Sequence, residues 1–315
     1  MNVVAVVGPT ATGKSGLGVE LALALGGQVV NADAFALYRG MDIGTAKTTK
    51  AQRRGVVHHL VDVVGPDVAV SVAQYREAGR TVLADLAERG QRAVVVGGSG
   101  LYVRALLDPM QFPGTDPGLR ETLERRAETE GAAAVHAELA ALAPQAAAAI
   151  DPRNVRRVVR ALEVYALTGR PPTTDLPTYT YEVPAVQLGL ELDREALDAA
   201  ITTRVESMWA AGLVEEVRTL RDAGMSRTAR GAVGYAQVLA MLDGQVDEPT
   251  AQAQTVTATR RLARKQMGWF GRDPRVHWLA ADAPDLLDQA LALVADADAG
   301  RLVDPAAPTR RPLPG

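Results

Sequence analysis

The chain has 315 residues, of which 47% are hydrophobic, 4% aromatic and 23% charged. This length allows one large α/β domain with an elaboration or two modest domains, and the composition excludes a disordered chain. The net charge of −3 excludes nucleic-acid binding by bulk electrostatics, so such a partner needs a local basic patch. The absence of cysteine excludes disulfides, thiolate catalysis and cysteine-based zinc sites.

The N-terminal stretch MNVVAVVGPT has no basic region and only a short apolar run before Gly-Pro. It therefore predicts a strand rather than a signal peptide. No apolar run in the sequence approaches the roughly 18 residues that a membrane span needs. We expect a cytoplasmic protein without a membrane partner, and a monomer as its default state.

The stretch GPTATGKS matches the G-x-x-x-x-G-K-S pattern between a predicted strand and an amphipathic run at 16–25. The backbone N–H groups of such a loop bind phosphate, Lys14 adds a positive charge, and the Ser15 hydroxyl can hold Mg²⁺. An ordinary glycine-rich turn is the alternative, but the flanking patterns favour a phosphate site. The predicted phosphate or diphosphate site consists of Gly8, Pro9, Thr10, Ala11, Thr12, Gly13, Lys14 and Ser15.

Short apolar runs alternate with helix-like stretches along the first hundred residues, which predicts a parallel sheet covered on both faces. Ser71 and Gln74 form a capping box that starts a helix reaching to about Glu88, and Gly90 ends it. The expected strands are 3–7, 28–32, 60–64, 92–96, 186–192 and 276–279, and later helices are expected near 194–223, 232–242 and 250–270.

The strand pattern disappears from residue 113 to about residue 181, where several helices are expected. Asp151 and Pro152 predict the N-cap and first residue of a helix that ends at Gly169. We predict an α/β fold with a P-loop NTPase-like parallel core and an inserted all-helical domain. The predicted parts are 1–112 for the first part of the core, 113–182 for the insertion, 183–303 for the return to the core and the C-terminal helices, and 304–315 for a flexible tail.

Two polar residues follow predicted strands. The fourth predicted strand ends in glycine where many ATPases carry a metal-binding aspartate, so the usual hydrolytic apparatus is not evident. Asp33 follows the second strand, and a parallel sheet would place it beside the phosphate loop. It is either a general base or the N-cap of a following helix. Ser99, in GGSGLY, is either a cap or turn residue or a residue that a substrate approaches closely.

Two arginine-rich stripes indicate a nucleic-acid partner. The first lies opposite the apolar face of a predicted helix, and arginine without lysine favours phosphate recognition over a solvated face. The second precedes Trp269 and Phe270, which either stack on bases or belong to the core. The first stripe is Arg153, Arg156, Arg157 and Arg160, and the second is Arg260, Arg261, Arg264 and Lys265.

Eight blocks over roughly residues 3 to 280 resemble the bacterial tRNA dimethylallyltransferase family, in the family's order. The resemblance implies a P-loop core with a helical insertion, a tRNA anticodon stem-loop as partner and a need for Mg²⁺. It implies transfer of a dimethylallyl group from dimethylallyl diphosphate to the exocyclic amine of the adenine just 3′ of the anticodon, in tRNAs that read codons beginning with U. The blocks are GPTATGKS, YRGMDIGTAK, HHLVDV, GGSGLY, NVRRVVRALEVYALTG, RVESMWAAGLVEEV, AVGYAQ and ATRRLARKQMGWF.

By the same resemblance, Asp33 is the general base, and Lys14 and Ser15 act in catalysis with it. Arg204 joins residues 8–15 in binding the diphosphate, and Ser99 stands where the family usually has threonine. The tRNA contacts that it implies are Asp33, Ala34, Phe35, Ala36, Ser99, Arg156, Arg157, Val158, Val159, Arg160, Gly231, Gly234 and Tyr235.

The chain departs from the family pattern at several positions. Ala34 and Ala36 replace a common serine and a frequent glutamine, so these positions cannot make side-chain hydrogen bonds, and Gly268 replaces a larger or polar residue. The zinc-binding extension of eukaryotic relatives is absent, as the lack of cysteine requires. Two other functions remain open: a small-molecule kinase with ATP in the loop, and a non-catalytic nucleotide-dependent RNA-binding protein.

Overall fold

The computed structural model describes residues 3–172 and 178–302. The chain divides into two compact units, one formed by Met1–Asp108 with Tyr179–Gly315 and the other by Pro109–Thr178. We call the first the core unit and the second the helical unit. The tail predicted at 304–315 lies outside the described residues.

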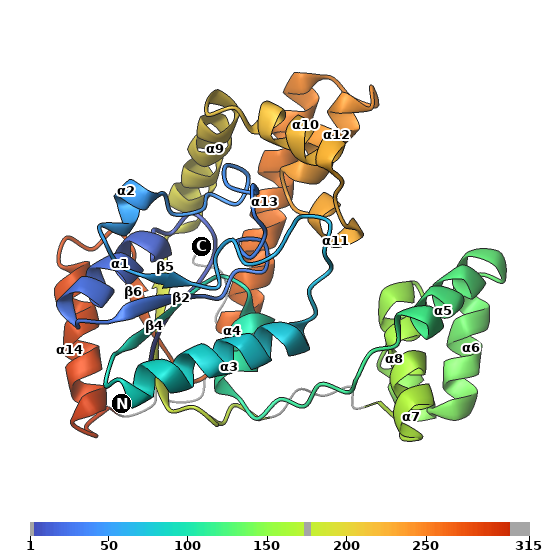
Figure 1. Cartoon of the computed structure of the whole chain (residues 1–315), viewed down its shortest axis with the longest axis horizontal. Helices are drawn as coiled ribbons and strands as arrows, with labels where there is room; N and C mark the ends of the chain where they lie inside the picture. The colour runs from blue at the N-terminus through green and yellow to red at the C-terminus, as the bar shows by residue number, and fades with distance from the viewer. Residues whose placement is uncertain (1–2, 173–177, 303–315) are drawn as a thin grey trace. The chain divides into compact units, whose positions relative to one another are not determined.

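The core unit contains a sheet in which all pairings are parallel, with the strand order β3-β2-β4-β1-β5-β6 (Figure 1). Parallel neighbours need long crossovers, which explains why helices separate the strands along the chain. The strands are β1 (Val3–Val7), β2 (Gln28–Asn31), β3 (His58–His59), β4 (Ala93–Val96), β5 (Ala185–Glu191) and β6 (Val276–Ala280).

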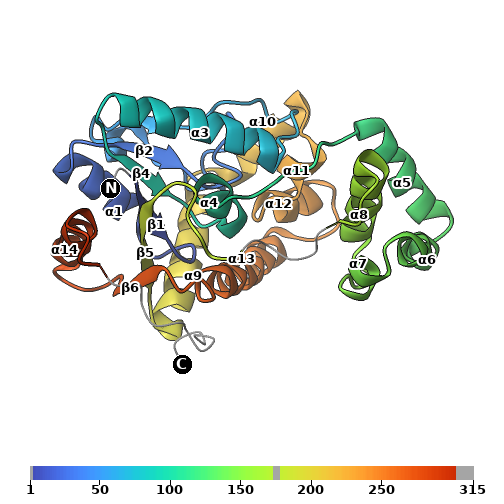
Figure 2. The same cartoon turned by 90° about the horizontal axis from the view of Figure 1, so that it is seen from below.

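The strands β1 and β4 are apolar throughout because both faces of the middle of the sheet are buried. Val3 and Val7 of β1 belong to one hydrophobic core, whereas Val4 and Val6 belong to the other. Helices α3 (Val72–Glu88) and α4 (Gly100–Leu107) cover the first face, and α1 (Lys14–Ala24) and α14 (Leu286–Asp298) cover the second. Figure 2 shows α3 and α14 on opposite sides of the sheet. The predicted capping box of Ser71 and Gln74 starts α3.

The strand predicted at 60–64 is wrong. β3 consists of His58–His59, and only Val64 pairs again, in an isolated bridge with Tyr38. Leu60 and Asp62 have positive φ angles of 58° and 59°, which take the chain out of the extended conformation.

The helix predicted over 194–223 is two helices. Gly212 has a φ of 97° and separates α9 (Arg194–Ala210) from α10 (Leu213–Ala223), because a left-handed residue interrupts a right-handed helix. No helix among the described residues is long and apolar enough to cross a membrane. The other helices of the core unit are α2 (Lys50–Arg53), α11 (Arg227–Arg230), α12 (Tyr235–Leu242) and α13 (Glu248–Phe270).

The helical unit has a hydrophobic core of its own, to which every one of its helices contributes. The start predicted at Asp151 is wrong: the last helix begins at Val155, and the Asn154 side chain caps it by accepting from the Arg157 N–H. Asp151 forms an ion pair with Arg153 instead. Its helices are α5 (Pro117–Thr129), α6 (Ala132–Leu142), α7 (Pro144–Ala148) and α8 (Val155–Thr168).

Candidate active site

The phosphate loop joins β1 to α1 at the carboxyl edge of the sheet. Gly8 has a φ of 131°, and a Cβ there would lie 2.5 Å from the Leu190 carbonyl oxygen, so only glycine fits. The Thr12 hydroxyl donates to the Pro9 carbonyl at 2.9 Å and braces the turn. No side chain caps the N-terminus of α1, which leaves its first backbone N–H groups available to an anion.

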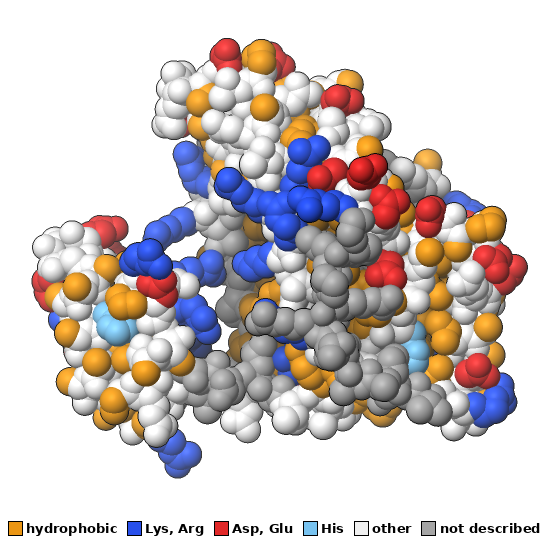
Figure 3. Space-filling model, turned by 180° about the vertical axis from the view of Figure 1, so that it is seen from behind, with side chains coloured by type: hydrophobic (Ala, Val, Ile, Leu, Met, Phe, Trp, Pro, Cys, Tyr) orange, Lys and Arg blue, Asp and Glu red, His pale blue; other side chains and the backbone are white. Residues whose placement is uncertain are grey.

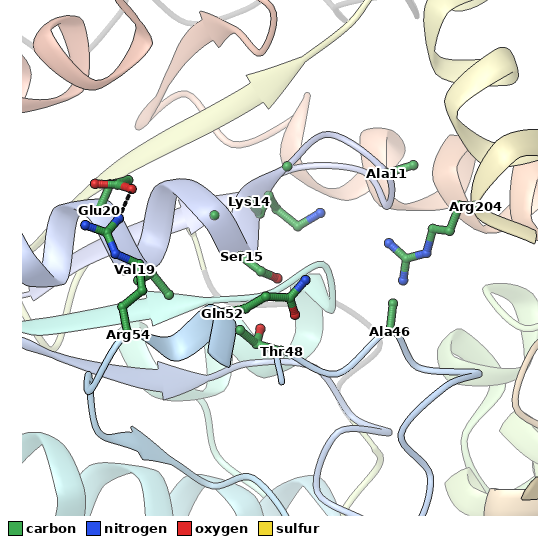
Figure 4. Close-up of a pocket in the computed structure, with 12 residues that line it drawn as sticks. Ala11, Lys14, Ser15, Val19, Glu20, Ala46, Thr48, Gln52, Arg54 and Arg204 are labelled. Carbon is green, nitrogen blue, oxygen red and sulfur yellow. Dashed lines mark hydrogen bonds and ion pairs between the residues drawn. The ribbon is translucent and has the colours of Figure 1, made fainter. Parts of the chain in front are cut away.

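A cavity of about 440 Å³ opens beside this loop. Lys14 and Ser15 reach it from α1, and Arg204 reaches it from α9. Figure 4 shows the Lys14 and Arg204 side chains directed into the same space from opposite sides. The structure thus brings together the loop and the distant arginine that the family resemblance implied. The other lining residues are Ala11, Gly13, Gly16, Val19, Glu20, Ala46, Thr48, Gln52 and Arg54.

Burial disfavours the charged forms of both Lys14 and Arg204. Burial, together with the positive charge of Arg204, lowers the pKa of Lys14 to about 7, whereas Asp33 opposes the shift. Burial also lowers the pKa of Arg204, again opposed by Asp33. Buried positive groups without a paired anion are favourable for binding a ligand of high negative charge.

A bound diphosphate is expected to raise the pKa of Lys14, so binding takes up protons above pH 7 and its affinity falls as the pH rises. At pH 8, a lysine with a pKa of about 7 is deprotonated in roughly nine tenths of the molecules. Titration calorimetry with inorganic diphosphate, in buffers of different ionisation enthalpy, measures this uptake. The Lys14→Arg variant is the control, because its guanidinium stays protonated; equal uptake by both proteins would contradict the prediction.

Asp33 lies in a turn after β2, and no helix follows it, so its interpretation as an N-cap is wrong. Its backbone N–H donates to Asn31 Oδ1 at 2.9 Å, and Asn31 Nδ2 donates to the Asp33 carbonyl at 2.9 Å. Asp33 Oδ1 accepts from the Phe35 N–H at 2.8 Å. The carboxylate is half-buried, and Oδ2 has no protein partner among the described residues. This oxygen is available to accept a proton.

Ser99 stands at the N-terminus of α4, but its hydroxyl does not cap that helix. The Ala34 N–H donates to Ser99 Oγ at 3.4 Å, which links the exits of β2 and β4. Ser99 therefore lies beside the segment that carries Asp33. Ala34 and Phe35 are half-buried, whereas Ala36 is buried, so its side chain cannot reach a ligand.

Gln266 of α13 supports the phosphate loop, and it is absent from the residues predicted for the site. It is 6% exposed, and its Oε1 accepts from the Thr10 N–H at 2.8 Å. A Cβ at Gly98 would lie 2.2 Å from Gln266 Nε2, so the glycine after β4 makes room for this side chain. The sequence offered only its place in the ATRRLARKQMGWF block as a signal.

We expect Gln266→Ala to leave the partly buried Thr10 N–H unpaired. A buried unpaired donor costs about 1–3 kcal/mol. Urea denaturation should show this loss in the free energy of unfolding, with weaker binding of inorganic diphosphate. Gln254→Ala is the matched control, since Gln254 is exposed on the same helix. Equal stability of the two variants would show that the Gln266 bond contributes nothing.

The arginine stripe of α8 is narrower than predicted. Val158 and Val159 are 0% and 1% exposed and belong to the core of the helical unit, so their predicted contact with RNA is wrong for their side chains. Arg160 donates to Glu163 Oε2 at 2.7 Å and to the carbonyls of residues 113 and 114. Arg156 and Arg157 remain exposed, with no ion-pair partner in the part of the chain that the structure describes.

The predicted contacts at 231–235 divide in the same way. Gly231 is exposed and Gly234 is buried. Tyr235 is 0% exposed and its hydroxyl donates to Glu216 Oε1 at 2.6 Å, so its side chain cannot contact a ligand. The predicted contact of the Tyr235 side chain with tRNA is therefore wrong, and this residue supports the fold instead.

On α13, the second basic stripe keeps most of its exposed cations. Arg260 pairs with Asp198, and Phe270 is a core residue. Figure 3 shows Lys and Arg side chains gathered on one face of the protein. The exposed members of this stripe are Arg261, Arg264 and Lys265.

The described residues contain no group of three or more His, Asp or Glu side chains that could hold a metal. A phosphate-loop Mg²⁺ does not need one, because phosphate oxygens and water supply most of its ligands. The exposed Ser15 at the start of α1 lines the cavity and fits such a site (Figure 4).

A parallel sheet with a strand, a phosphate loop and a helix at its carboxyl edge defines a P-loop fold. A family model described as IPP transferase matches residues 36–273. The tRNA dimethylallyltransferase of Bifidobacterium longum is 52% identical over 304 residues, covering 95% of this chain and 92% of the relative. That of Thermobifida fusca is 54% identical, covering 94% and 95%. The chain belongs to the IPP transferase family.

Solved structures agree with this assignment. The full-length tRNA isopentenylpyrophosphate transferase of Bacillus halodurans has a TM-score of 0.71 and 35% identity, covering 95% of this chain and 97% of that one. A eukaryotic dimethylallyltransferase acting on tRNA has a TM-score of 0.84 over 99% of this chain and 82% of that one. At 23% identity, this second likeness concerns the fold alone.

Proposed function

We propose that this protein transfers a dimethylallyl group from dimethylallyl diphosphate to the exocyclic amine of the adenine just 3′ of the anticodon, in tRNAs that read codons beginning with U. The observation that carries the proposal is that the phosphate loop and Arg204 of α9 line one cavity, and that Asp33 interacts electrostatically with both Lys14 and Arg204. Family membership over nearly the whole chain supports it. We also propose that the protein works as a cytoplasmic monomer.

An allylic diphosphate reacts when its C–O bond breaks, so negative charge grows on the departing diphosphate. Lys14, Arg204 and the N–H groups of the phosphate loop would stabilise that charge in a partly enclosed cavity. Mg²⁺ held by Ser15 would add positive charge at the diphosphate oxygens. With two cations beside the diphosphate, the cavity would stabilise the negative charge that the leaving group gains when the C–O bond breaks.

The adenine amine is a poor nucleophile because its lone pair is delocalised into the ring. Its proton becomes acidic only as the new C–N bond forms, and Asp33 Oδ2 is available to accept that proton. The base must first leave its stacked position, at an expected cost of a few kcal/mol. Ser99 and the residues after Asp33 would meet the extruded base.

Asp33→Asn should keep the bond to the Phe35 N–H but lose the proton acceptor. We expect transfer from radiolabelled dimethylallyl diphosphate to fall by about 10²–10⁴-fold, with diphosphate and tRNA binding retained. Asp288→Asn, an exposed change on α14, should keep full activity. Full activity of the Asp33 variant would rule out its role as base.

Replacing Arg156 and Arg157 together by alanine should weaken tRNA binding and reduce its salt dependence. Two lost phosphate contacts lower the slope of log K against log salt by about 1.5. Filter binding at several salt concentrations measures this slope. Arg125→Ala is the control, since Arg125 is exposed in the same unit but paired with Glu121. An unchanged slope would show that Arg156 and Arg157 only face solvent and do not contact the tRNA phosphates.

Nucleoside analysis by mass tests the reaction itself. The protein is incubated with unmodified tRNA, dimethylallyl diphosphate and Mg²⁺, and adenosine should gain one isoprenoid unit. ATP consumption without a modified nucleoside would instead indicate a small-molecule kinase. Binding of tRNA with neither reaction would indicate a non-catalytic RNA-binding protein.

A further inference from the structure

The loop at residues 42–48 forms one wall of the cavity that holds Lys14 and Arg204. Ala46 and Thr48 line the cavity. Arg204 Nη2 donates to the Thr45 carbonyl at 3.4 Å. Among the described residues, this carbonyl is the one hydrogen-bond partner of the Arg204 guanidinium. The loop has no helix or strand of its own, so contacts with other elements must define its position.

Glu216 of α10 makes such contacts with three consecutive residues of the loop. Its Oε2 accepts from the N–H groups of Asp42 at 3.0 Å and Ile43 at 2.7 Å. Its Oε1 accepts from the Gly44 N–H at 3.2 Å. Consecutive backbone N–H groups that converge on one point favour an anion. Here the protein supplies that anion itself.

Tyr235 of α12 holds the Glu216 carboxylate from the other side. Its hydroxyl donates to Glu216 Oε1 at 2.6 Å, and burial together with Glu216 raises its pKa, so it remains a donor. A Cβ at Gly44 would lie 2.4 Å from Tyr235 Cε2. The tyrosine ring therefore packs against the loop at a position where only glycine fits.

Lys47 connects the loop to itself and to neighbouring segments, but it does not connect the loop to α10 as Glu216 does. Its Nζ contacts Asp42 Oδ1 and Asp62 Oδ1, each at 2.6 Å, and its side chain is nearly buried. It also donates to the Tyr38 carbonyl at 2.8 Å. These contacts set the shape of the loop, whereas Glu216 attaches that shape to α10.

We infer that Glu216 is a positioning residue for diphosphate binding. By attaching the 42–48 loop to α10, it places the Thr45 carbonyl where that oxygen directs Arg204 toward Lys14. The inference rests on the proposed function for the identity of the substrate, but its central claim concerns the affinity of the cavity for a diphosphate.

The test is Glu216→Gln, which keeps the size of the side chain and removes its charge. The Kd for inorganic diphosphate with Mg²⁺, measured by calorimetry, should rise about tenfold. The KM for dimethylallyl diphosphate should rise equally, with kcat within about twofold. Glu215→Gln is the matched control, with the same charge change at an exposed neighbour that pairs with Arg218. It should bind like the parent protein.

Gly44→Ala gives a second route that leaves the carboxylate unchanged and displaces the loop against Tyr235. It should raise the same Kd and KM, and it decides the question if Glu216→Gln does not fold, as thermal unfolding would show. Unchanged diphosphate affinity in the folded variants, or lost kcat at constant KM, would overturn the inference. A parent protein that binds diphosphate but modifies no tRNA would instead refute the proposed function.

Discussion

Lys14 and Arg204 share one cavity, and neither has an ion-pair partner among the described residues. Burying two positive groups costs free energy, which appears as the lowered pKa of both, and the charge of Arg204 adds to the shift of Lys14. The surrounding fold must supply that free energy before any ligand arrives. A ligand of high negative charge recovers it on binding, so the site is organised for its substrate in advance.

Distant parts of the chain maintain this arrangement. Lys14 is held by the turn after β1, whose Thr10 N–H is bound by Gln266 of the long helix α13. Arg204 comes from α9 and contacts a loop that Glu216 attaches to α10. The site therefore needs helices from the C-terminal half of the chain as well as the phosphate loop near the N-terminus. A truncated core would keep the phosphate-loop motif and lose the geometry that makes it selective.

The helical unit contributes differently. It has its own hydrophobic core, and several of its arginines form ion pairs with carboxylates of the same unit. Arg120 and Arg160 both form ion pairs with the buried Glu163. Burial raises the pKa of Glu163, but the hydrogen bonds from these two arginines lower it below its usual value. A surface that looked like a four-arginine stripe is thus partly a structural ion-pair network. Within that stripe, Arg156 and Arg157 are the arginines without an ion pair among the described residues.

Local patterns in the sequence were enough to predict the parallel sheet, the capping box at Ser71 and the phosphate loop, because these depend on neighbouring residues. They failed at 60–64 and at Asp151, where positive φ angles and a competing ion pair changed the local outcome. Family blocks pointed to Asp33 and Arg204 but did not distinguish contact residues from core residues such as Tyr235.

The sequence by itself therefore determined the fold class, the phosphate loop and the family. Tertiary structure alone decided which residues face the cavity. Gln266 and Glu216 are remote from residues 8–15 along the chain and follow no spacing rule that would link them to it. Packing of α10 and α13 brings them to the site, because backbone N–H groups in these turns need partners that local structure does not provide.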